Sequence, residues 1–339
     1  MKKKKIKALV TAEVCRDLLE KELSDRIDFT YKGYAVDHRV LPPNELKNTL
    51  GDYQILISEY DTISEEILNA AIKLKLIVCC RGGVRSVIDL DTATKRGIQV
   101  FNTAGRNANA VTDMVIGYLF CLTRNIVLTN ELIHSRKLTM NESTKPKEYK
   151  DTVWGLDDKS PFIVYRGRSL DKMTVGLVGF GHAGKLMAQK LHMFSMKILA
   201  YDPFSDFKDK PEYVTRVNFQ TILEQSDVIS LHCTLTDKSR GMFSAKEFDM
   251  MKEGSFFINT SRGELINEED LVEALNHGRL AGAALDVTRK EPIPADSPLL
   301  QAKKLILTPH IAGSSQDVQE CGTKMVVDIV QNYLAKGEI

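Results

Sequence analysis

The chain has 339 residues, which is enough for about two domains of ordinary size. Charged residues make up 27% of it and hydrophobic residues 43%, a composition that excludes a disordered chain. The 46 Lys and Arg residues balance 45 Asp and Glu residues, so no strong overall field favours nucleic acid or an anionic membrane as a partner.

The N-terminal segment and the cysteines favour a cytoplasmic protein. The lysine-rich start precedes an apolar run over 8–10 that is too short for an export signal. The longest apolar stretch, over 114–122, is shorter than the roughly 18 residues of a membrane span. The six cysteines show neither a Cys-x-x-Cys motif nor the spacing of a metal site, so we expect no bound metal and no disulfide framework.

The first part of the chain predicts a parallel sheet. Helical patterns separate predicted strands at 6–10, 54–57, 74–79 and 98–101. Strands that alternate with helices in this order are typical of parallel α/β sheets. A long apolar helix is expected over 111–136, followed by a polar loop over 140–159.

The second part repeats the alternation more strongly. Strands are predicted at 174–178, 197–201, 228–231, 255–258, 281–287 and 305–307, with helices between them. The best marked helix covers 267–275, with Asn267 as its N-cap, acidic residues in its first turn and Gly278 beyond its end. The fold is therefore expected to be of the α/β class.

A glycine-rich turn follows the first strand of this second part. Gly179, Gly181 and Gly184 form a GxGxxG pattern between the strand at 174–178 and a helical pattern over 185–194. Asp202 lies at the end of the next predicted strand. Strand, glycine turn, helix and acid together make up the dinucleotide-binding fingerprint.

The fingerprint predicts NAD as the cofactor. The first glycine permits a tight turn, the second lets the backbone approach a pyrophosphate, and the third lets helix and strand pack closely. The start of the helix offers amide donors and positive charge to the pyrophosphate. Asp202 would bind the adenosine ribose and repel a 2′-phosphate, which favours NAD over NADP. The competing interpretation is a glycine turn that binds no ligand.

Arg262, Glu291 and His310 are the candidate catalytic residues. Arg262 and His310 directly follow predicted strands, and ligands of open parallel sheets bind beyond the carboxyl ends of strands. Together with the fingerprint, the three residues predict hydride transfer at a carbinol carbon. Arg262 would bind a carboxylate, His310 would exchange the hydroxyl proton, and Glu291 would orient His310 and favour its charged form. Taken singly, each residue could instead be structural or merely exposed.

Many ordered segments resemble the D-isomer-specific 2-hydroxyacid dehydrogenases, and they span nearly the whole chain. They include the glycine turn and the three candidate catalytic residues with their neighbours. The segments that carry the resemblance are 179–184, Asp202, 259–263, 281–287, 291–292 and 308–313, with 81–84, 88–90 and 95–102 upstream.

The resemblance implies a Rossmann NAD-binding domain over 108–308, inserted into a flavodoxin-like substrate domain made of 1–107 and 309–339. It implies catalysis by Arg262, Glu291 and His310 in a cleft between doubly wound domains, and a homodimer formed through the NAD-binding domain. The implied cofactor contacts are Gly179, Gly181, His182, Ala183, Gly184, Asp202, Cys233, Thr234, Thr260, Ser261, Arg262, Asp286, His310, Ala312 and Gly313. The implied substrate contacts are Arg81, Gly82, Gly83, Arg262 and His310.

The segment 58–62 bears on the identity of the substrate. Phosphoglycerate-oxidising members of the family resemble one another in carrying an arginine there, whereas this chain has Glu59 and Asp61. An acid at this place would repel a phosphate, and the regulatory domain that many phosphoglycerate dehydrogenases append is missing from the sequence. Arg81 and Arg85 could still attract a phosphate, so the sequence leaves the 2-hydroxy acid open.

Two alternatives share this fold. Formate-oxidising relatives have glutamine in place of the acid that pairs with the histidine, and Glu291 argues against that branch. Transcriptional corepressors of the same fold keep the three candidate catalytic residues, so a dinucleotide-sensing binding protein is the alternative from a different functional class. Turnover of a 2-keto acid would distinguish the enzyme from the sensor.

Overall fold

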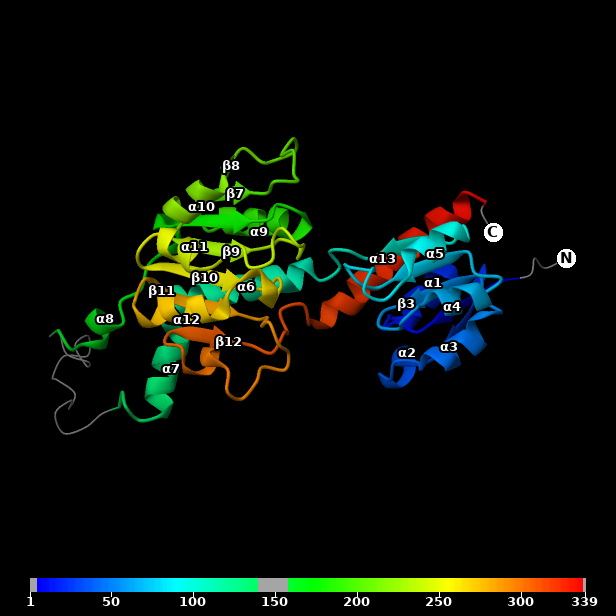
Figure 1. Ribbon diagram of the computed structural model, residues 1–339, viewed down its shortest axis with the longest axis horizontal. Coiled ribbons are helices and arrows are strands. Elements are labelled where there is room, and N and C mark those ends of the chain that lie inside the picture. The colour runs from blue at the N-terminus through cyan, green and yellow to red at the C-terminus, as the bar shows by residue number, and fades with distance from the viewer. Residues whose placement is uncertain (1–4, 140–157, 338–339) are drawn as a thin grey trace. The chain divides into compact units, whose positions relative to one another are not determined.

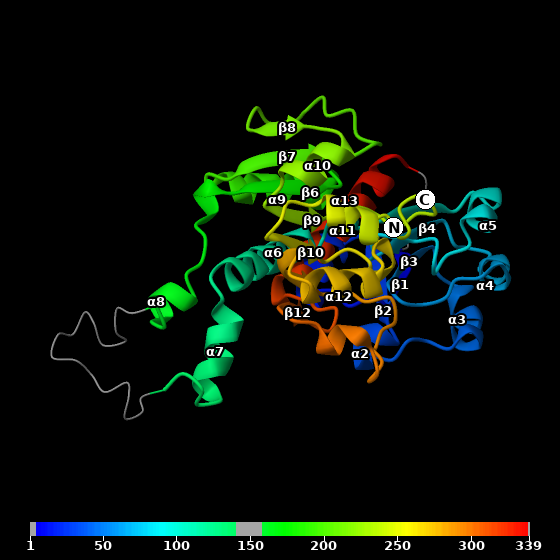
Figure 2. The same ribbon diagram turned by 60° about the vertical axis from the view of Figure 1, so that its left-hand side comes forward.

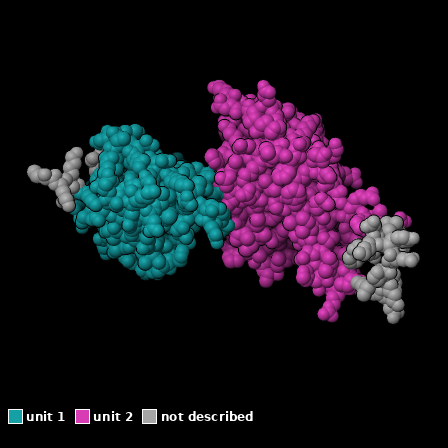
Figure 3. All heavy atoms as spheres, turned by 180° about the vertical axis from the view of Figure 1, so that it is seen from behind, with its two compact units in different colours: residues 1–107, 314–339 teal, residues 108–313 magenta. Residues whose placement is uncertain are grey.

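The computed structural model describes residues 5–139 and 158–337, which fall into two compact units coloured separately in Figure 3. Unit 1 comprises 1–107 and 314–339, and unit 2 comprises 108–313. The sequence placed the second boundary between 308 and 309. The structure keeps 309–313 in unit 2, because the Asp286 carboxylate accepts the amides of Ile311 and Ala312 at 2.9 and 2.7 Å. Of the predicted loop over 140–159, residues 140–157 lie outside the described residues.

Unit 1 is a five-stranded parallel sheet in the order β2-β1-β3-β4-β5, with helices on both faces (Figure 1). Its strands are β1 (Ile6–Val10), β2 (Ile27–Tyr31), β3 (Ile55–Ser58), β4 (Leu76–Cys79) and β5 (Gln99–Asn102). Its helices are α1 (Arg16–Leu23), α2 (Tyr34–Asp37), α3 (Pro43–Leu50), α4 (Glu65–Ala70), α5 (Leu90–Lys95) and α13 (Gln316–Ala335). Ala8 and Val10 pack with α1 and α13, whereas Leu9 packs with α3 and α4.

Unit 2 is a seven-stranded parallel sheet in the order β12-β11-β10-β9-β6-β7-β8. Its strands are β6 (Thr174–Val178), β7 (Lys197–Tyr201), β8 (Val214–Arg216), β9 (Val228–Leu231), β10 (Ser255–Asn259), β11 (Leu280–Leu285) and β12 (Leu305–Leu307). Its helices are α6 (Ala108–Thr123), α7 (Ile126–His134), α8 (Pro161–Val164), α9 (His182–His192), α10 (Phe219–Gln225), α11 (Ala245–Met250) and α12 (Glu268–Asn276). Helices α6 and α9 cover one face, and α10, α11 and α12 cover the other.

These two parallel sheets confirm the predicted α/β fold class. Strands β2 and β8 were not predicted, and both lie at the edge of their sheet. An edge strand is buried less completely than a central strand, so its sequence need not be a continuous apolar run. Strand β2 includes Asp28 and Thr30, and β8 has only the three residues of 214–216.

The single helix predicted over 111–136 is wrong, because the structure has two helices there. Helices α6 and α7 meet at a bend of 65°, where Asn125 has a φ of 55°. A residue in this left-handed region cannot continue a right-handed helix. In the described part of the chain no single helix is long and apolar enough to cross a membrane, although α6 and α7 pass that test as a bent pair.

The strand order of unit 2 reverses at β6. The chain runs from β6 outward to β7 and β8, and then returns to the other side of β6 as β9. In open α/β sheets, ligands bind beyond the carboxyl ends of the strands at such a reversal. The residues that follow β6 and β9 are therefore the first place to look for a cofactor site.

Candidate functional site

The glycine turn lies at this reversal. Gly179 has a φ of 99°, and a side chain there would come within 2.5 Å of the His232 backbone at the end of β9. A side chain at Gly184 would come within 2.2 Å of the Gly179 carbonyl oxygen. At Gly181, by contrast, a Cβ would meet no atom of the described residues within 4 Å. Two of the glycines are therefore needed for packing, and the third leaves its face open to a ligand.

Helix α9 directs its start toward this turn. It begins at His182, earlier than the predicted 185, with Gly181 as its N-cap. The amides of its first turn, at His182, Ala183 and Gly184, have no partners within the helix. Amides at a helix start carry partial positive charge and suit an anion such as a pyrophosphate.

Asp202 follows β7 beside the turn. Its carboxylate accepts the amides of Phe180 and Phe204, both at 2.8 Å, and of Ser205 at 3.2 Å. Asp202 therefore shapes the glycine turn in addition to its predicted role as a ribose acceptor. The hydroxyl of Thr260 is buried without a partner among the described residues. An open glycine, helix-start amides, an acid and an unpaired hydroxyl suit the polar groups of a dinucleotide.

Two titratable residues after β9 do not change charge near neutral pH. Burial lowers the pKa of His232 to about 4, and its Nε2 lies 3.0 Å from the Ser230 hydroxyl. Burial raises the pKa of the Cys233 thiol to about 11. The imidazole is therefore neutral and the thiol protonated at pH 7, which leaves neither suited to proton exchange with a substrate at that pH.

Asn259, at the end of β10, shapes the loop that presents Arg262. Its amide nitrogen donates to the Arg262 carbonyl at 2.8 Å, and its side-chain oxygen accepts the Ser261 amide at 2.9 Å. The Ser261 hydroxyl donates to the Leu231 carbonyl of β9 at 2.7 Å. The Arg262 side chain is exposed at the end of this braced turn. No role was predicted for Asn259 from the sequence, although an Asn that precedes a tight turn is a known signal of such bonds.

Gly263 brings the Arg262 loop against the segment that follows β11. A Cβ at Gly263 would lie only 2.0 Å from the Thr288 carbonyl carbon and 2.4 Å from the Arg289 amide nitrogen. Only a glycine allows the two backbones to come this close. The loops that carry Arg262 and Glu291 are therefore in contact.

His310 and Glu291 form a direct pair. The Nδ1 atom of His310 lies 2.6 Å from the Glu291 carboxylate, whose other oxygen accepts the Thr288 amide at 3.1 Å. Both side chains are part-exposed to solvent. Because Nδ1 faces the carboxylate, Nε2 is the ring nitrogen left for a ligand. A carboxylate, an imidazole and solvent access are the requirements of an acid–base pair.

Asp286 supports the loop that carries His310. Asp286 is only 1% exposed, and its carboxylate accepts the hydroxyl of Thr308 at 2.5 Å, besides the amides of Ile311 and Ala312. Thr308 is also bonded to the Tyr118 hydroxyl of α6. Through these bonds the carboxylate holds the loop that carries His310. The predicted contact of Asp286 with the cofactor stays a prediction.

The remaining predicted residues fall on two separate units. Cys233 and Thr234 follow β9, and Ala312 and Gly313 follow His310, all at the carboxyl edge of the unit 2 sheet. Arg81, Gly82 and Gly83 follow β4 in unit 1, where the Arg81 guanidinium lies 5.4 Å from the centre of the Tyr60 ring.

The two acids of 58–62 do not present free charge. Glu59 is 2% exposed and paired with Arg106. Asp61 is equally buried, accepts the Thr11 hydroxyl at 2.5 Å, and has a pKa raised by burial. Neither acid is therefore presented to solvent as an unpaired charge, and the predicted repulsion of a phosphate stays a prediction.

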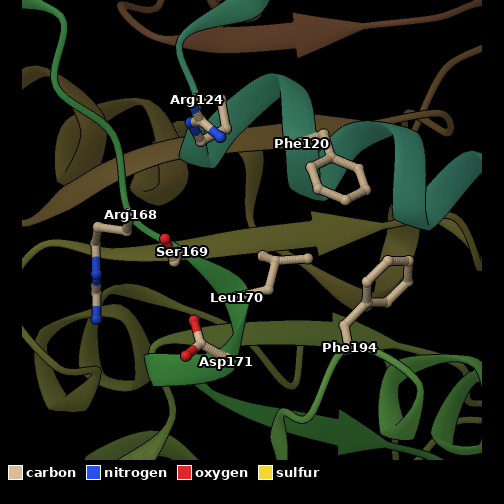
Figure 4. Close-up of a pocket in the computed structure, with 7 residues that line it drawn as sticks. All are labelled: Phe120, Arg124, Arg168, Ser169, Leu170, Asp171 and Phe194. Atoms are coloured by element: carbon tan, nitrogen blue, oxygen red, sulfur yellow. The ribbon is translucent and has the colours of Figure 1, made fainter. Parts of the chain in front are cut away.

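A separate surface pocket of about 250 Å³ lies at the opposite end of β6 (Figure 4). It includes Leu170 and Asp171, which precede β6, whereas the glycine turn follows β6. Its lining residues are Phe120, Arg124, Arg168, Ser169, Leu170, Asp171 and Phe194. The pocket is therefore not part of the candidate cofactor site.

Comparison with known proteins supplies a family. Residues 116–312 match the model of the D-isomer specific 2-hydroxyacid dehydrogenase NAD-binding domain. A putative 2-hydroxyacid dehydrogenase of Bacillus subtilis, YoaD, is 34% identical over 78% of this chain and 72% of its own length. A glyoxylate reductase of Thermococcus litoralis is 34% identical over 82% of this chain and 79% of its own. A D-lactate dehydrogenase of Lactobacillus jensenii, solved with NAD+, shares the fold with a TM-score of 0.77 at 24% identity, covering 98% of each chain.

Proposed function

The chain belongs to the D-isomer specific 2-hydroxyacid dehydrogenases, and we propose that His310 and Glu291 are its acid–base pair and that Arg262 binds the substrate carboxylate. As a member of this family it is an NAD-dependent oxidoreductase of small 2-hydroxy acids. The observation that carries the proposed roles is the 2.6 Å contact between His310 Nδ1 and the Glu291 carboxylate.

Each proposed role follows from the position of the side chain. When bound, NADH supplies the hydride that reduces the carbonyl carbon of a 2-keto acid. His310 gives the proton from Nε2 to the carbonyl oxygen, while Glu291 keeps the ring oriented and stabilises its positive charge. Arg262 donates one hydrogen bond to the Ser261 carbonyl at 2.5 Å, and its remaining N–H groups are available to bind a carboxylate.

A screen of NADH oxidation against 2-keto acids tests the proposal. The panel comprises glyoxylate, hydroxypyruvate, pyruvate, branched-chain keto acids, 3-phosphohydroxypyruvate and phosphorylated sugar derivatives. The matched variant is His310→Asn, because His310 has a φ of 57° and asparagine tolerates that conformation. We expect its turnover to fall by roughly 100-fold or more while the variant still binds NADH.

The outcomes of the screen separate the hypotheses. Turnover by His310→Asn at the wild-type rate would remove His310 from the chemistry. NADH binding without turnover of any keto acid would favour the dinucleotide-sensing alternative.

For the substrate we propose a small 2-keto acid, with glyoxylate as the first probe because a relative carries the name glyoxylate reductase. The buried state of Glu59 and Asp61 keeps phosphorylated keto acids among the candidates. Arg81, Gly82 and Gly83 are the proposed substrate contacts of unit 1, and Gly82 and Gly83 are exposed there.

We propose that the enzyme is a homodimer formed through unit 2. Helices α7 and α8 extend beyond the helices that cover the sheet in both Figure 1 and Figure 2. They expose a group of large apolar side chains: Ile126, Val127, Leu128, Ile133, Phe162, Ile163 and Val164. Large apolar side chains that gather on an exposed surface are typical of subunit interfaces.

The mass in solution tests this assembly. Ile163→Asp is expected to convert a dimer into a monomer in size-exclusion chromatography with light scattering. The matched control is Ile72→Asp, since Ile72 is an exposed apolar residue of unit 1. A wild-type monomer, or the same change with both variants, would contradict the proposed interface.

We also propose a cytoplasmic location. All six cysteines lie in the described residues and all are free, which suits a reducing compartment. Cell fractionation followed by detection of the protein with an antibody tests this location.

A further inference from the structure

The segment that carries Glu291 is held from behind by a buried acid, Glu268. Glu268 is the first residue of α12, and its side chain is only 9% exposed. Its carboxylate accepts the Arg289 backbone amide at 2.6 Å. A buried carboxylate is costly unless it is bonded, so this contact strongly favours one position of the Arg289 backbone.

The loop that carries Arg262 and the loop that carries Glu291 meet at the backbone of Thr288 and Arg289. The Thr288 amide donates to Glu291, and the Thr288 hydroxyl donates to the Lys290 carbonyl at 2.7 Å. On its other side, the same backbone contacts Gly263, the neighbour of Arg262. A shift of the Arg289 amide would therefore disturb the supports of both Glu291 and Arg262.

We infer that Glu268 is a positioning residue for hydride transfer, which acts through the Arg289 amide on the proposed pair of Glu291 and His310. Glu268 makes no contact with either member of that pair among the contacts of the described residues. The inference rests on the proposed function, and it adds a residue whose carboxylate acts on the geometry of the site and not on the reacting atoms.

Glu269, the next residue of α12, provides a matched control. Like Glu268, whose carboxylate also lies 3.4 Å from Arg289 Nε, it pairs with the Arg289 guanidinium, but its side chain is 59% exposed. It has no bond to the Arg289 amide, which Glu268 occupies. An exposed ion pair contributes little, so loss of Glu269 removes a charge of the same sign from the same helix turn and leaves the backbone contact in place.

The experiment compares Glu268→Ala, Glu268→Gln and Glu269→Ala with wild type, using the keto acid that wild type reduces fastest. For Glu268→Ala we expect kcat to fall roughly 10- to 100-fold with unchanged NADH affinity. Glu268→Gln keeps an acceptor for the Arg289 amide and is expected to stay within about threefold of wild type. Glu269→Ala is expected to stay within about twofold.

A kinetic isotope effect separates positioning from a loss of folded enzyme. With NADH deuterated at C4 of the nicotinamide, the isotope effect on kcat is expected to rise in Glu268→Ala, because the chemical step becomes slower. A smaller folded fraction would lower kcat and leave the isotope effect unchanged, and that result would overturn the inference. Equal losses in the alanine and glutamine variants would also overturn it.

A second variant and a crystal structure also test the inference. If Glu268→Ala does not fold, Glu268→Asp replaces it, because aspartate withdraws the carboxylate from the Arg289 amide by one methylene. A crystal structure of the variant gives a readout without turnover, in which the contact of His310 with Glu291 is expected to lengthen beyond hydrogen-bond distance. An unchanged contact would overturn the inference, whereas a wild type that reduces no keto acid would overturn the proposed function.

Discussion

Asp286 holds His310 through the backbone on both sides of the imidazole. The Asp286 carbonyl accepts the His310 amide at 2.8 Å, and the Asp286 carboxylate accepts the amides of Ile311 and Ala312. These bonds keep His310 at a φ of 57°, a conformation that costs a non-glycine residue about 1 kcal/mol or more. The direction of the imidazole therefore depends on a carboxylate that never touches it.

Removal of that carboxylate is expected to reduce both stability and activity. Asp286→Ala leaves two amides and the Thr308 hydroxyl without their acceptor, which we expect to cost roughly 3 kcal/mol of the free energy of unfolding. We expect kcat of the folded variant to fall about 100-fold, because the imidazole is no longer held. Urea unfolding and steady-state kinetics measure the two effects. A folded Asp286→Ala enzyme with wild-type kcat would contradict the positioning role.

The strands that the sequence predicted best are those buried on both faces. The predicted bounds of β1, β6, β7 and β9 agree with the structure, because a central parallel strand is a short, continuous apolar run between turn signals. The bounds of β12 also agree, although β12 lies at the edge of its sheet and is only part-buried. The bend between α6 and α7 could not be predicted in this way. Asn125 interrupts the helix through its backbone conformation, and the apolar period continues across it.

The site was predictable where the backbone itself demands a residue type. Close packing at Gly179 and Gly184 excludes any side chain, so the spacing of these glycines can be recognised in the sequence. The state of Glu59 was not predictable, because it depends on Arg106, which lies far away along the chain. The same holds for the contact of Glu268 with the Arg289 amide. Neither partner can be identified before the fold brings the two together.

The glycine turn predicts opposite effects for two alanine substitutions. Gly181→Ala adds a Cβ into open space, so we expect the melting temperature to stay near that of wild type while NADH affinity falls at least tenfold. Gly184→Ala adds a Cβ at 2.2 Å from the Gly179 carbonyl oxygen, so we expect destabilisation of roughly 2 kcal/mol or more. Thermal melts and NADH titration by fluorescence measure the pair. Equal affinity loss without destabilisation in both variants would show that the packing argument for Gly184 is wrong.

Charge at Asp202 is expected to set the preference for NADH over NADPH. Asp202→Asn keeps the size of the side chain and removes the charge that would repel a 2′-phosphate. We expect the ratio of kcat/KM for NADH to that for NADPH to fall roughly tenfold or more. Because Asp202 also accepts the Phe180 and Phe204 amides, the affinity for NADH is expected to fall as well.

Asp206 supplies the control for this experiment. It is exposed in the same loop and pairs with Lys208. Asp206→Asn makes the same change of net charge, and we expect the cofactor preference to stay as in wild type. A similar loss of discrimination in both variants would assign the preference to the general field of the loop and not to Asp202.

Asp227 predicts a pH-dependent contribution to stability at the start of β9. Burial would raise its pKa, but its bonds to Lys252, Arg168 and the Thr174 amide, at 2.7, 2.7 and 2.8 Å, outweigh burial and lower the pKa. A carboxyl whose folded-state pKa is lowered stabilises the protein above its unfolded pKa of about 3.9. That contribution is lost as the pH falls through the folded-state pKa.

Asp227→Asn is therefore expected to lower the free energy of unfolding by roughly 2 kcal/mol at pH 7. This is less than the usual loss when a buried ion pair is broken, because Arg168 and Lys252 can turn to solvent. The difference from wild type is expected to shrink between pH 7 and an acid pH below the folded-state pKa, where the wild-type carboxyl has lost its charge. Urea unfolding at the two pH values measures it. Asp171→Asn, which removes an exposed acid paired with Lys172, is expected to change stability by less than about 0.5 kcal/mol at both. If Asp227→Asn lowers the free energy of unfolding by the same amount at both pH values, the ion pairs of Asp227 do not stabilise unit 2. The buried side chain would then contribute only through its shape and its bond to the Thr174 amide.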